Sequence, residues 1–310
     1  MLLRNVSFQR ESGVALIVVL WMLVVMTAMA LAFSQQVRTE VMLTANYQNQ
    51  AKALSLAEAG IWRGTAMILN RTIAENNGEQ INLSGSVYDL DSEHGKLKVS
   101  LQSSSGLIDL NRASPEIIKA LMQTIDTPDE TQKTILDSLL DWRDEDDLKR
   151  LAGAEDDDYR AQGLSYGPSN GLMISISELA RVNGVTSLEY EALQSSMTIY
   201  SGQSRIDITS APRRVLASLP SMDASMVDSI VNERETGNKH IDLTQIPAET
   251  RKYIGAGQNE FIRISSFAEV NASISGVIAV VKLEATERLP VTVMSWRQHI
   301  DSVFMDKSSN

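Results

Sequence analysis

The densest group of side chains able to do chemistry is a run of carboxylates near the middle of the chain. Residues 141–158 contain nine acids and only three bases, so this stretch carries a net charge of −6 out of −11 for the whole chain. Like charges crowded into one loop repel one another unless solvent or a cation screens them. Carboxylate oxygens at this density suit Ca²⁺. The acids are Asp141, Asp144, Glu145, Asp146, Asp147, Glu155, Asp156, Asp157 and Asp158.

Two interpretations of these carboxylates stay open. An EF-hand is excluded, because the stretch DWRDEDD lacks the central glycine of that loop. The cluster is either a solvated acidic loop, as most charge runs are, or a Ca²⁺ site that closes the loop. In the second case a cation would bridge the end of the LLDWRD helix to the GAEDDDY stretch. The predicted ligands are then Asp144, Asp146, Glu155, Asp156 and Asp157.

No catalytic constellation accompanies the acids. The segment from Gly163 to Gly167 matches the hydrolase pattern G-x-S-x-G, but its flanks suit neither the strand nor the helix that a nucleophile elbow needs. We therefore predict a turn there. The histidines His94, His240 and His299 are scattered. The chain has no cysteine, which excludes disulfides and thiolate metal sites. We expect a protein that is not an enzyme.

The N-terminal segment predicts a membrane anchor. Residues 14–33 carry no charge, and twenty residues of helix rise about 30 Å, enough to cross the core of a bilayer. The short polar leader in front of them contains Arg4 and Arg10. Basic flanks stay in the cytoplasm, so the bulk of the chain is expected on the other side of the membrane.

Three kinds of N-terminus fit this pattern. A secretory signal could be cut at Ala30-Leu31-Ala32, but the apolar run is longer than the usual ~7–15 residues. An uncleaved signal anchor is the second interpretation. The third is a prepilin-type signal, cut on the cytoplasmic side after Gly13, which would leave Val14 as the first residue of the mature protein.

The residues after the anchor favour the prepilin-type signal. No proline interrupts residues 34–69, and apolar residues recur there mostly in steps of three or four. Anchor and extension predict one helix over 14–69, about 84 Å long, although a plain membrane stalk is the alternative for its second half. The recurring residues are Val37, Val41, Ala45, Ala51, Leu54, Ala57 and Ile61.

Strands and a helical insertion are predicted in the remainder. Alternating apolar and polar residues indicate strands near 85–90, 96–102, 260–266, 277–286 and 290–296, with a turn near Glu287–Pro290. Between the second and third strands, IDLNRASP at 108–115 is echoed by IDITSAP at 206–212. Each copy leads into an apolar helical run, because its polar side chains and proline suit a helix start.

This near-repeat is similar to a helix-hairpin-helix or SAM-like unit. DNA-binding versions of that unit present a glycine-rich hairpin to a phosphate. The corresponding stretches LPSMDASMV and IDTPDETQ contain aspartate and no glycine. The acidic surface of the chain also repels phosphate backbones. We therefore expect the repeats to be a scaffold, with no nucleic acid as partner.

Several motifs carry a family resemblance. The leader ending in Gly13, the start VALIVVLWML and the segment ALSLAEAGIWRG resemble type IV pilin-like proteins. The segments LIDLNRASPEII, LLDWRDEDD, GAEDDDY, SISELARVNGV and RIDITSAPRRVL are similar to the minor pseudopilin K of type II secretion systems. Pilins usually have glutamate as fifth mature residue, and the K subunits lack it; here that residue is Val18. Pilins also usually begin with phenylalanine, and Val14 departs from this, which bears on N-methylation of the first residue.

The resemblance implies a fold and a function. The expected fold class is α+β, with a long transmembrane pilin helix packed on a small antiparallel sheet and a large all-helical insertion. The implied role is a tip subunit of the secretion pseudopilus, which primes assembly with the minor pseudopilins I and J. It implies cleavage by prepilin peptidase, a single-pass anchor in the bacterial inner membrane, a periplasmic domain, and calcium in the insertion. The rival hypothesis is a membrane-anchored DNA-binding protein of an uptake system.

The expected organisation follows from these elements. It comprises a leader (1–13), the transmembrane and pilin helix (14–69), the first pilin strands (70–105), the helical insertion (106–200), the second repeat with a linker (201–257) and the C-terminal strands (258–310).

Overall fold

The computed structural model describes residues 12–77, 80–125, 127–236, 241–258, 260–284, 290–301 and residue 304. Contacts divide the chain into two compact units, residues 1–52 and 53–310.

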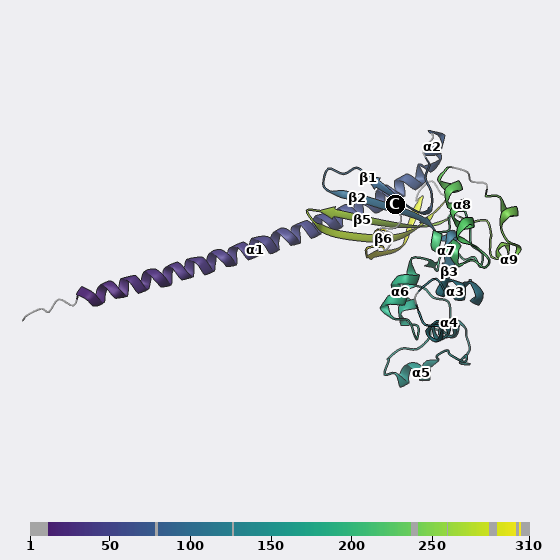
Figure 1. Cartoon of the computed structure of the whole chain (residues 1–310), viewed down its shortest axis with the longest axis horizontal. Helices are drawn as coiled ribbons and strands as arrows, with labels where there is room; N and C mark the ends of the chain where they lie inside the picture. Colours follow the sequence, from purple (N-terminus) through teal and green to yellow (C-terminus); the bar gives the residue numbers. More distant parts are fainter. Residues whose placement is uncertain are drawn as a thin grey trace, which may run out of the picture. The chain divides into compact units, whose positions relative to one another are not determined.

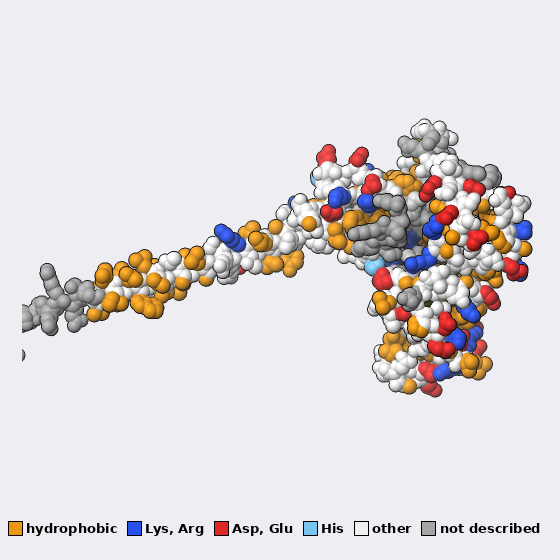
Figure 2. Space-filling view, in the orientation of Figure 1, with side chains coloured by type: hydrophobic (Ala, Val, Ile, Leu, Met, Phe, Trp, Pro, Cys, Tyr) orange, Lys and Arg blue, Asp and Glu red, His pale blue; other side chains and the backbone are white. Residues whose placement is uncertain are grey.

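The first unit is the N-terminal part of helix α1 (Ser12–Leu69). Side chains of residues 14–48 are exposed to solvent, and apolar side chains cover the beginning of the helix (Figure 2). Among the described helices, α1 alone is long and apolar enough to cross a membrane, with a mean hydropathy of 2.8 over its most apolar window. The predicted continuous helix over 14–69 is confirmed.

The second unit contains a five-stranded antiparallel sheet (Figure 1). Its strands are β1 (Ser84–Leu90), β2 (Lys96–Ser103), β5 (Phe261–Val270), β6 (Ser273–Leu283) and β7 (Val291–Gln298), and their order in the sheet is β1-β2-β5-β6-β7. Strands from both ends of the chain therefore meet at the β2–β5 pair. Together with α1 and the helices between β2 and β5, this confirms the α+β fold class.

The last turns of α1 pack closely on one face of this sheet. A Cβ atom added at Gly60 would lie 2.1 Å from Ser266 Oγ, and one at Gly64 would lie 2.9 Å from side-chain atoms of Val99 and Ile264. The two glycines of AEAGIWRG therefore let the helix backbone approach the strands. The shared core consists of Ala57, Ile61, Ile68, Ile81, Leu83, Leu97, Val99, Leu101, Ile262, Ile264, Ala268, Val277, Ala279 and Val281.

The first two predicted strands are confirmed, and the strands predicted at 260–266 and 277–286 are present but leave an interval unassigned between them. Strands β5 and β6 fill that interval and are joined by Asn271 and Ala272 alone. Both have positive φ, 47° and 66°, as a two-residue type I′ hairpin turn requires. The sequence hid the turn because alanine rarely adopts this conformation. Residues 287–289 of the turn predicted before β7 lie outside the described residues.

Helical elements and one short parallel strand pair, β3–β4, fill the chain between the neighbouring strands β2 and β5, so the insertion is not all-helical as predicted. They share one hydrophobic core that includes residues from Ile108 to Ile246, so the predicted segments 106–200 and 201–257 pack as one body. A short helix α2 (Arg71–Asn76) follows α1. The elements of the insertion are η1 (Ser104–Gly106), β3 (Ile108–Asp109), α3 (Pro115–Met122), α4 (Asp129–Arg143), α5 (Asp156–Ala161), η2 (Ile176–Arg181), α6 (Ser187–Gln194), β4 (Met197–Thr198), α7 (Arg213–Ser218), α8 (Ala224–Glu235), η3 (Leu243–Gln245) and α9 (Ala248–Arg251).

The near-repeat in the sequence is also a repeat in hydrogen bonding. Asp109 Oδ1 accepts from the Asn111 N–H and Asp207 Oδ1 from the Thr209 N–H, both at 2.9 Å. Each copy leads into a helix, α3 or α7, as predicted.

The two copies also share an arginine contact and a parallel strand contact. The second helix of each copy donates an arginine to the carbonyls of this turn, Arg143 to Ala113 and Arg234 to Ala211. A parallel strand contact follows, Ile108 with Met197 and Ile206 with Ile254. The insertion is therefore built from two related helical modules.

Arg263 joins the insertion to the sheet. Its side chain lies on β5, is 6% exposed, and donates hydrogen bonds to the carbonyls of Gln194, Ser195 and Met197, at the end of α6 and on β4. The last carbonyls of a helix lack intrahelical partners and attract a cation. Burial lowers the pKa of Arg263 to about 10, so the guanidinium stays charged at neutral pH.

Replacing Arg263 by methionine is expected to destabilise the second unit by about 3 kcal/mol, because three buried carbonyls lose a charged donor. Urea unfolding of residues 34–310 measures this, since the described buried apolar side chains all lie at residue 53 or later. The control is Arg297→Met, a half-buried arginine on β7 that donates to Tyr190. Equal free energies of unfolding for the two variants would contradict the assignment.

Candidate cation site

The acidic stretch forms the connection between α4 and α5. Asp144 caps the C-terminus of α4 and Glu155 is the N-cap residue of α5. The Asp158 carboxylate accepts a hydrogen bond from the Glu155 N–H at 2.9 Å, which fixes the first turn of α5. The two helix ends predicted to face each other across the acidic loop are thus brought together, close enough for the carboxylates of Asp144 and Glu155 to repel one another.

Oxygen atoms without partners mark the interior of this loop. Glu155 is only 7% exposed, and neither of its carboxylate oxygens has a hydrogen-bond partner among the described residues. Asp144 Oδ1 and Asn170 Oδ1 are also buried and have no hydrogen-bond partner among the described residues. A buried polar atom without a partner costs about 1–3 kcal/mol, so this group of four oxygens is unfavourable as it stands.

Two basic residues neutralise part of the acidic charge. The Arg150 guanidinium contacts Asp141 Oδ1 at 2.6 Å and Asp144 Oδ2 at 2.5 Å, and the Lys149 ammonium contacts Asp158 Oδ1 at 2.6 Å. Asp141 is fully buried and also accepts from the Arg150 N–H. These pairs hold one side of the loop and leave Glu155 without a cationic partner among the described residues.

The carboxylate of Glu155 is repelled by the neighbouring carboxylates of the loop. Burial, together with the carboxylates of Asp141, Asp144, Asp147 and Asp146, raises the pKa of Glu155 to about 7. Near neutral pH the carboxyl group is therefore poised between its charged and neutral forms. Hydrogen-bond donors or a cation would each lower the cost of the charged form.

The predicted ligands are not equally placed. Asp144 and Glu155 lie at the buried group of oxygens. Asp146 is exposed and accepts from the Leu148 N–H at 2.9 Å. Asp156 and Asp157 are exposed and pair with Arg160 at 2.7 and 3.3 Å, so each already has a cationic partner. Among the described residues, no three acidic or histidine side chains converge as metal ligands do.

Sequence reasoning missed Asn170. Its backbone has φ 46°, its amide nitrogen donates to Asp147 Oδ1 at 3.1 Å in the acidic loop, and its own Oδ1 is buried without a partner among the described residues. The dipeptide Asn170-Gly171 is a turn signal, but nothing in its spacing places it beside Glu155. Carboxylate and amide oxygens are the hard ligands that Ca²⁺ takes. The donor set of Asp144, Glu155 and Asn170 therefore fits calcium, with fewer carboxylates than predicted.

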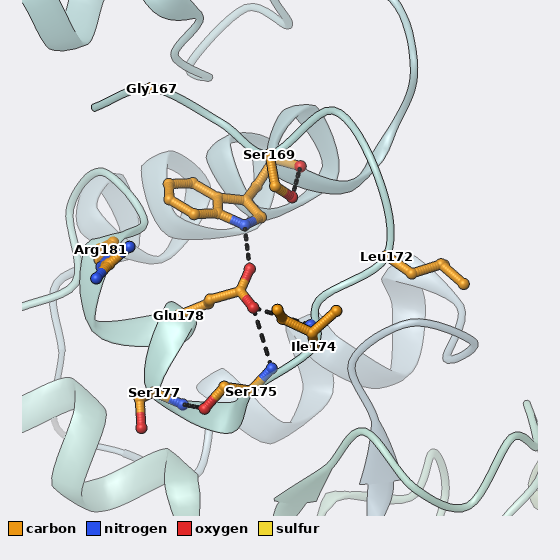
Figure 3. Close-up of a pocket in the computed structure, with 9 residues that line it drawn as sticks. Gly167, Ser169, Leu172, Ile174, Ser175, Ser177, Glu178 and Arg181 are labelled. Carbon is orange, nitrogen blue, oxygen red and sulfur yellow. Dashed lines mark hydrogen bonds between the residues drawn. The ribbon is translucent and has the colours of Figure 1, made fainter.

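Hydrogen bonds to the Glu178 carboxylate fix the segment that follows Asn170. Glu178 accepts from Trp142 Nε1 at 3.2 Å and from the N–H groups of Ile174 and Ser175 at 2.8 and 3.0 Å (Figure 3). The cavity beside it measures about 500 Å³ and is of a size common for pockets. These three hydrogen bonds hold residues 174–175 against α4, so the role of Glu178 is positioning.

The other sequence patterns fall in places without catalytic geometry. Gly163 has φ 78° just after α5, and Ser165 lies in an irregular segment, so the G-x-S-x-G match is a turn as predicted. His94 is exposed, and His299 lies 3.3 Å from Glu191. His240 lies outside the described residues.

The α7–α8 hairpin is unsuited to a phosphate. In the α7–α8 hairpin the Asp223 carboxylate accepts from the Met226 N–H at 2.8 Å, so an acid occupies the donors that a phosphate would need. None of the comparisons below supports the DNA-binding rival.

The middle of the chain matches a known protein family. Residues 96–202 match the model of "Type II secretion system (T2SS), protein K". This span runs from β2 through the first helical module and includes the acidic loop. Over this span the chain is similar to protein K of type II secretion systems.

Two relatives carry that name. The protein K of Aeromonas hydrophila is 29% identical over 60% of the chain, and that of Pectobacterium carotovorum subsp. carotovorum is 26% identical over 59% of the chain. The chain spans 63% and 61% of the lengths of these relatives.

A solved structure has the same fold. It is the crystal structure of the GspK-GspI-GspJ complex from the enterotoxigenic Escherichia coli type II secretion system. The match has a TM-score of 0.51 at 17% identity and covers 85% of this chain and 99% of that one. The α+β arrangement of the K family therefore holds at low sequence identity.

Glu155 predicts a pH dependence of stability in the presence of EDTA. Because the folded-state pKa is raised to about 7, the folded protein binds more protons than the unfolded chain between the two pKa values. The contribution of Glu155 to stability is therefore greatest below pH ~4.5 and is lost as pH rises through 7. We expect Glu155→Gln to remove this fall and to be about 1–3 kcal/mol more stable than the unchanged chain at pH 8.

Urea unfolding at pH 5 and pH 8 tests this expectation. Asp157→Asn is the matched control, since Asp157 is 98% exposed and its loss should change stability equally at both pH values. A Glu155→Gln variant with the same pH dependence as the unchanged chain would show that the buried carboxyl is not the source.

Proposed function

We propose that the chain is a minor pseudopilin that occupies the tip of a type II secretion pseudopilus and primes its assembly, with no catalytic activity of its own. The observation that supports this most is the helical body inserted between the neighbouring strands β2 and β5. A subunit with such a body does not repeat easily along a closely packed fibre. Val18 supports the same position, because it offers no carboxylate to pair with a subunit ahead.

The proposal includes processing and location. Prepilin peptidase cleaves between Gly13 and Val14, and the uncharged residues 14–33 then remain as a single-pass anchor in the inner membrane. Arg4 and Arg10 keep the leader in the cytoplasm, so the second unit lies in the periplasm. There the pseudopilus aids export of folded proteins across the outer membrane.

The partners in this proposal are the minor pseudopilins I and J. The solved relative is a K subunit in a complex with GspI and GspJ. By likeness of fold, we propose that this chain joins the corresponding subunits of its own system, and that their complex starts the fibre.

Deleting the chain is expected to abolish secretion and to reduce the number of pseudopili, while the unchanged chain supplied in trans restores both. Immunogold labelling of an epitope attached to α8, for example beside the exposed Ser225, should mark one end of isolated fibres. Secretion that persists after deletion, or label along the whole fibre, would contradict the tip assignment.

The acidic loop is the proposed site of a structural calcium ion. Asp144, Glu155 and Asn170 would supply oxygen ligands, and Asp146 and Asp147 lie near enough to Glu155 to add to the negative potential. When bound, the cation neutralises the carboxylates and links the end of α4 to the start of α5. This rests on the unpartnered oxygens of these residues and on the family resemblance.

Calcium is expected to raise the melting temperature of residues 34–310 relative to EDTA, since a ligand that binds only the folded state adds roughly 2.7 kcal/mol at a hundredfold excess over Kd. Mg²⁺ should do so poorly, because it demands a tighter octahedral shell. In Glu155→Gln the calcium-dependent gain should be lost, whereas Asp157→Asn should keep it. If the unsubstituted chain melts at the same temperature in EDTA, in Ca²⁺ and in Mg²⁺, the acidic loop does not bind a structural calcium ion.

A further inference from the structure

The two helical modules match residue by residue in two segments. The sequence TILDSLLDWR at 134–143 aligns with SMVDSIVNER at 225–234, and ISISELAR at 174–181 aligns with IDLTQIPA at 241–248. Each first segment ends in the arginine that returns to the aspartate turn, and each second segment contains an N-cap residue, Ser175 or Asp242. In both modules the two segments line a cavity together. The two cavities therefore occupy equivalent places, and their lining residues can be compared.

In the first module, groups of the chain itself satisfy the cavity. Glu178 accepts hydrogen bonds from Trp142 Nε1 and from two backbone N–H groups (Figure 3). Arg181 also lines this cavity and supplies a cation there. The carboxylate at the first cavity therefore has its partners within the module.

The second module has neither the indole nor the cation. Glu233 stands at the position of Trp142, and Ala248 stands at the position of Arg181. Glu233 is half-buried, and its carboxylate has no hydrogen bond or ion pair among the described residues. Its neighbour Arg234 is buried and donates to the turn before α7. A carboxylate therefore lines the second cavity without a cationic partner in the described part of the chain.

The second cavity combines apolar walls with acidic groups. It measures about 220 Å³, which is below the ~300–1,000 Å³ of most small-molecule sites, so it suits a single side chain. Hydrogen bonds from Thr244 and Gln245 lower the pKa of Asp242, which lines the cavity together with Glu233 and is ionised at neutral pH. None of the described lining residues is basic. We name the cavity the acidic pocket; its argued members are Met226, Ile230, Glu233, Ile241, Asp242 and Ile246.

We propose that the acidic pocket binds a lysine or arginine side chain of a partner protein. The aliphatic stem of that side chain packs on the methionine and isoleucines, and its cationic head pairs with Glu233 and Asp242. Long basic side chains favour this arrangement, because they bury their stems on apolar surface and keep the charged head at a polar edge. The bound cation takes the place that Arg181 has in the first module.

Charge complementarity selects a basic side chain over other occupants. A purely apolar side chain would cover the half-buried Glu233 carboxylate and leave it without a partner, which is costly. An acidic side chain would be repelled by both Glu233 and Asp242. The inference goes beyond the proposed function and does not depend on the position of the chain in the pseudopilus.

Peptide titration of the full chain in detergent micelles tests the proposal, with the isoleucine methyl groups observed by NMR. The probe is a blocked pentapeptide with one lysine among alanines, and matched peptides carry methionine or glutamate in its place. We expect the lysine peptide to shift the signals of Ile230, Ile241 and Ile246 and to bind at least about fivefold more tightly than the methionine peptide, with an affinity that falls as salt is added. Equal binding of the lysine and methionine peptides would overturn the proposal. So would a lysine peptide that moves none of these signals at about 10 mM, where a site with a Kd of ~1 mM is mostly filled.

Glu233→Gln tests the role of the carboxylate, since it removes the charge and keeps the shape of the side chain. We expect this variant to bind the lysine peptide at least about fivefold more weakly, because the cationic head loses its main partner. Glu235→Gln is the matched control, an exposed acid on the same helix that does not line the acidic pocket. If both variants bind the peptide as the unsubstituted chain does, the acidic pocket is not a site for a basic side chain. That result would leave the proposed function standing, because secretion and the labelling of fibre ends test it separately.

Discussion

The buried guanidinium of Arg263 is the interaction on which the architecture of the second unit depends. A sheet strand and the end of a helix belong to two separate hydrophobic cores, and apolar packing within each core does not fix one against the other. Arg263 donates to three carbonyls at the end of α6 and on β4 from within the sheet. Because its guanidinium has several donors in one plane and remains charged, it satisfies these carbonyls together, as a lysine could not.

The insertion itself is one module used twice, with an addition in the first copy. Both copies have an aspartate turn, two helices, an arginine that returns to the turn, and a parallel strand contact. In the second copy α8 is followed closely by η3, whereas in the first the acidic loop, α5 and the Asn170 segment lie between α4 and η2. The unpartnered oxygens thus lie in the added segment or at its junction with α4, where a cation bound as proposed would leave the shared module unchanged.

Much of this fold is readable from the sequence, and the reasons for the exceptions are physical. The length of α1 and the first strands follow from periodicity, and the helix starts follow from the repeated aspartate–proline turns. The join between β5 and β6 was hidden because Ala272 adopts a conformation that alanine disfavours. The roles of Arg263 and Asn170 depend on contacts between residues far apart in the chain, and no local pattern encodes them. For the acidic loop, composition indicated Asp144 and Glu155, but Arg160 lies three and four residues after Asp157 and Asp156 and pairs with both.

The central claim is that this chain is a processed, membrane-anchored pilin-like subunit. Its most direct test is the N-terminal sequence of the mature protein isolated from the membrane of cells that contain prepilin peptidase. We expect the mature protein to start at Val14, with the leader through Gly13 removed and the apolar helix kept. A mature protein that starts at Phe33 would indicate an ordinary signal peptide, and one that starts at Met1 an uncleaved anchor; either would contradict the account.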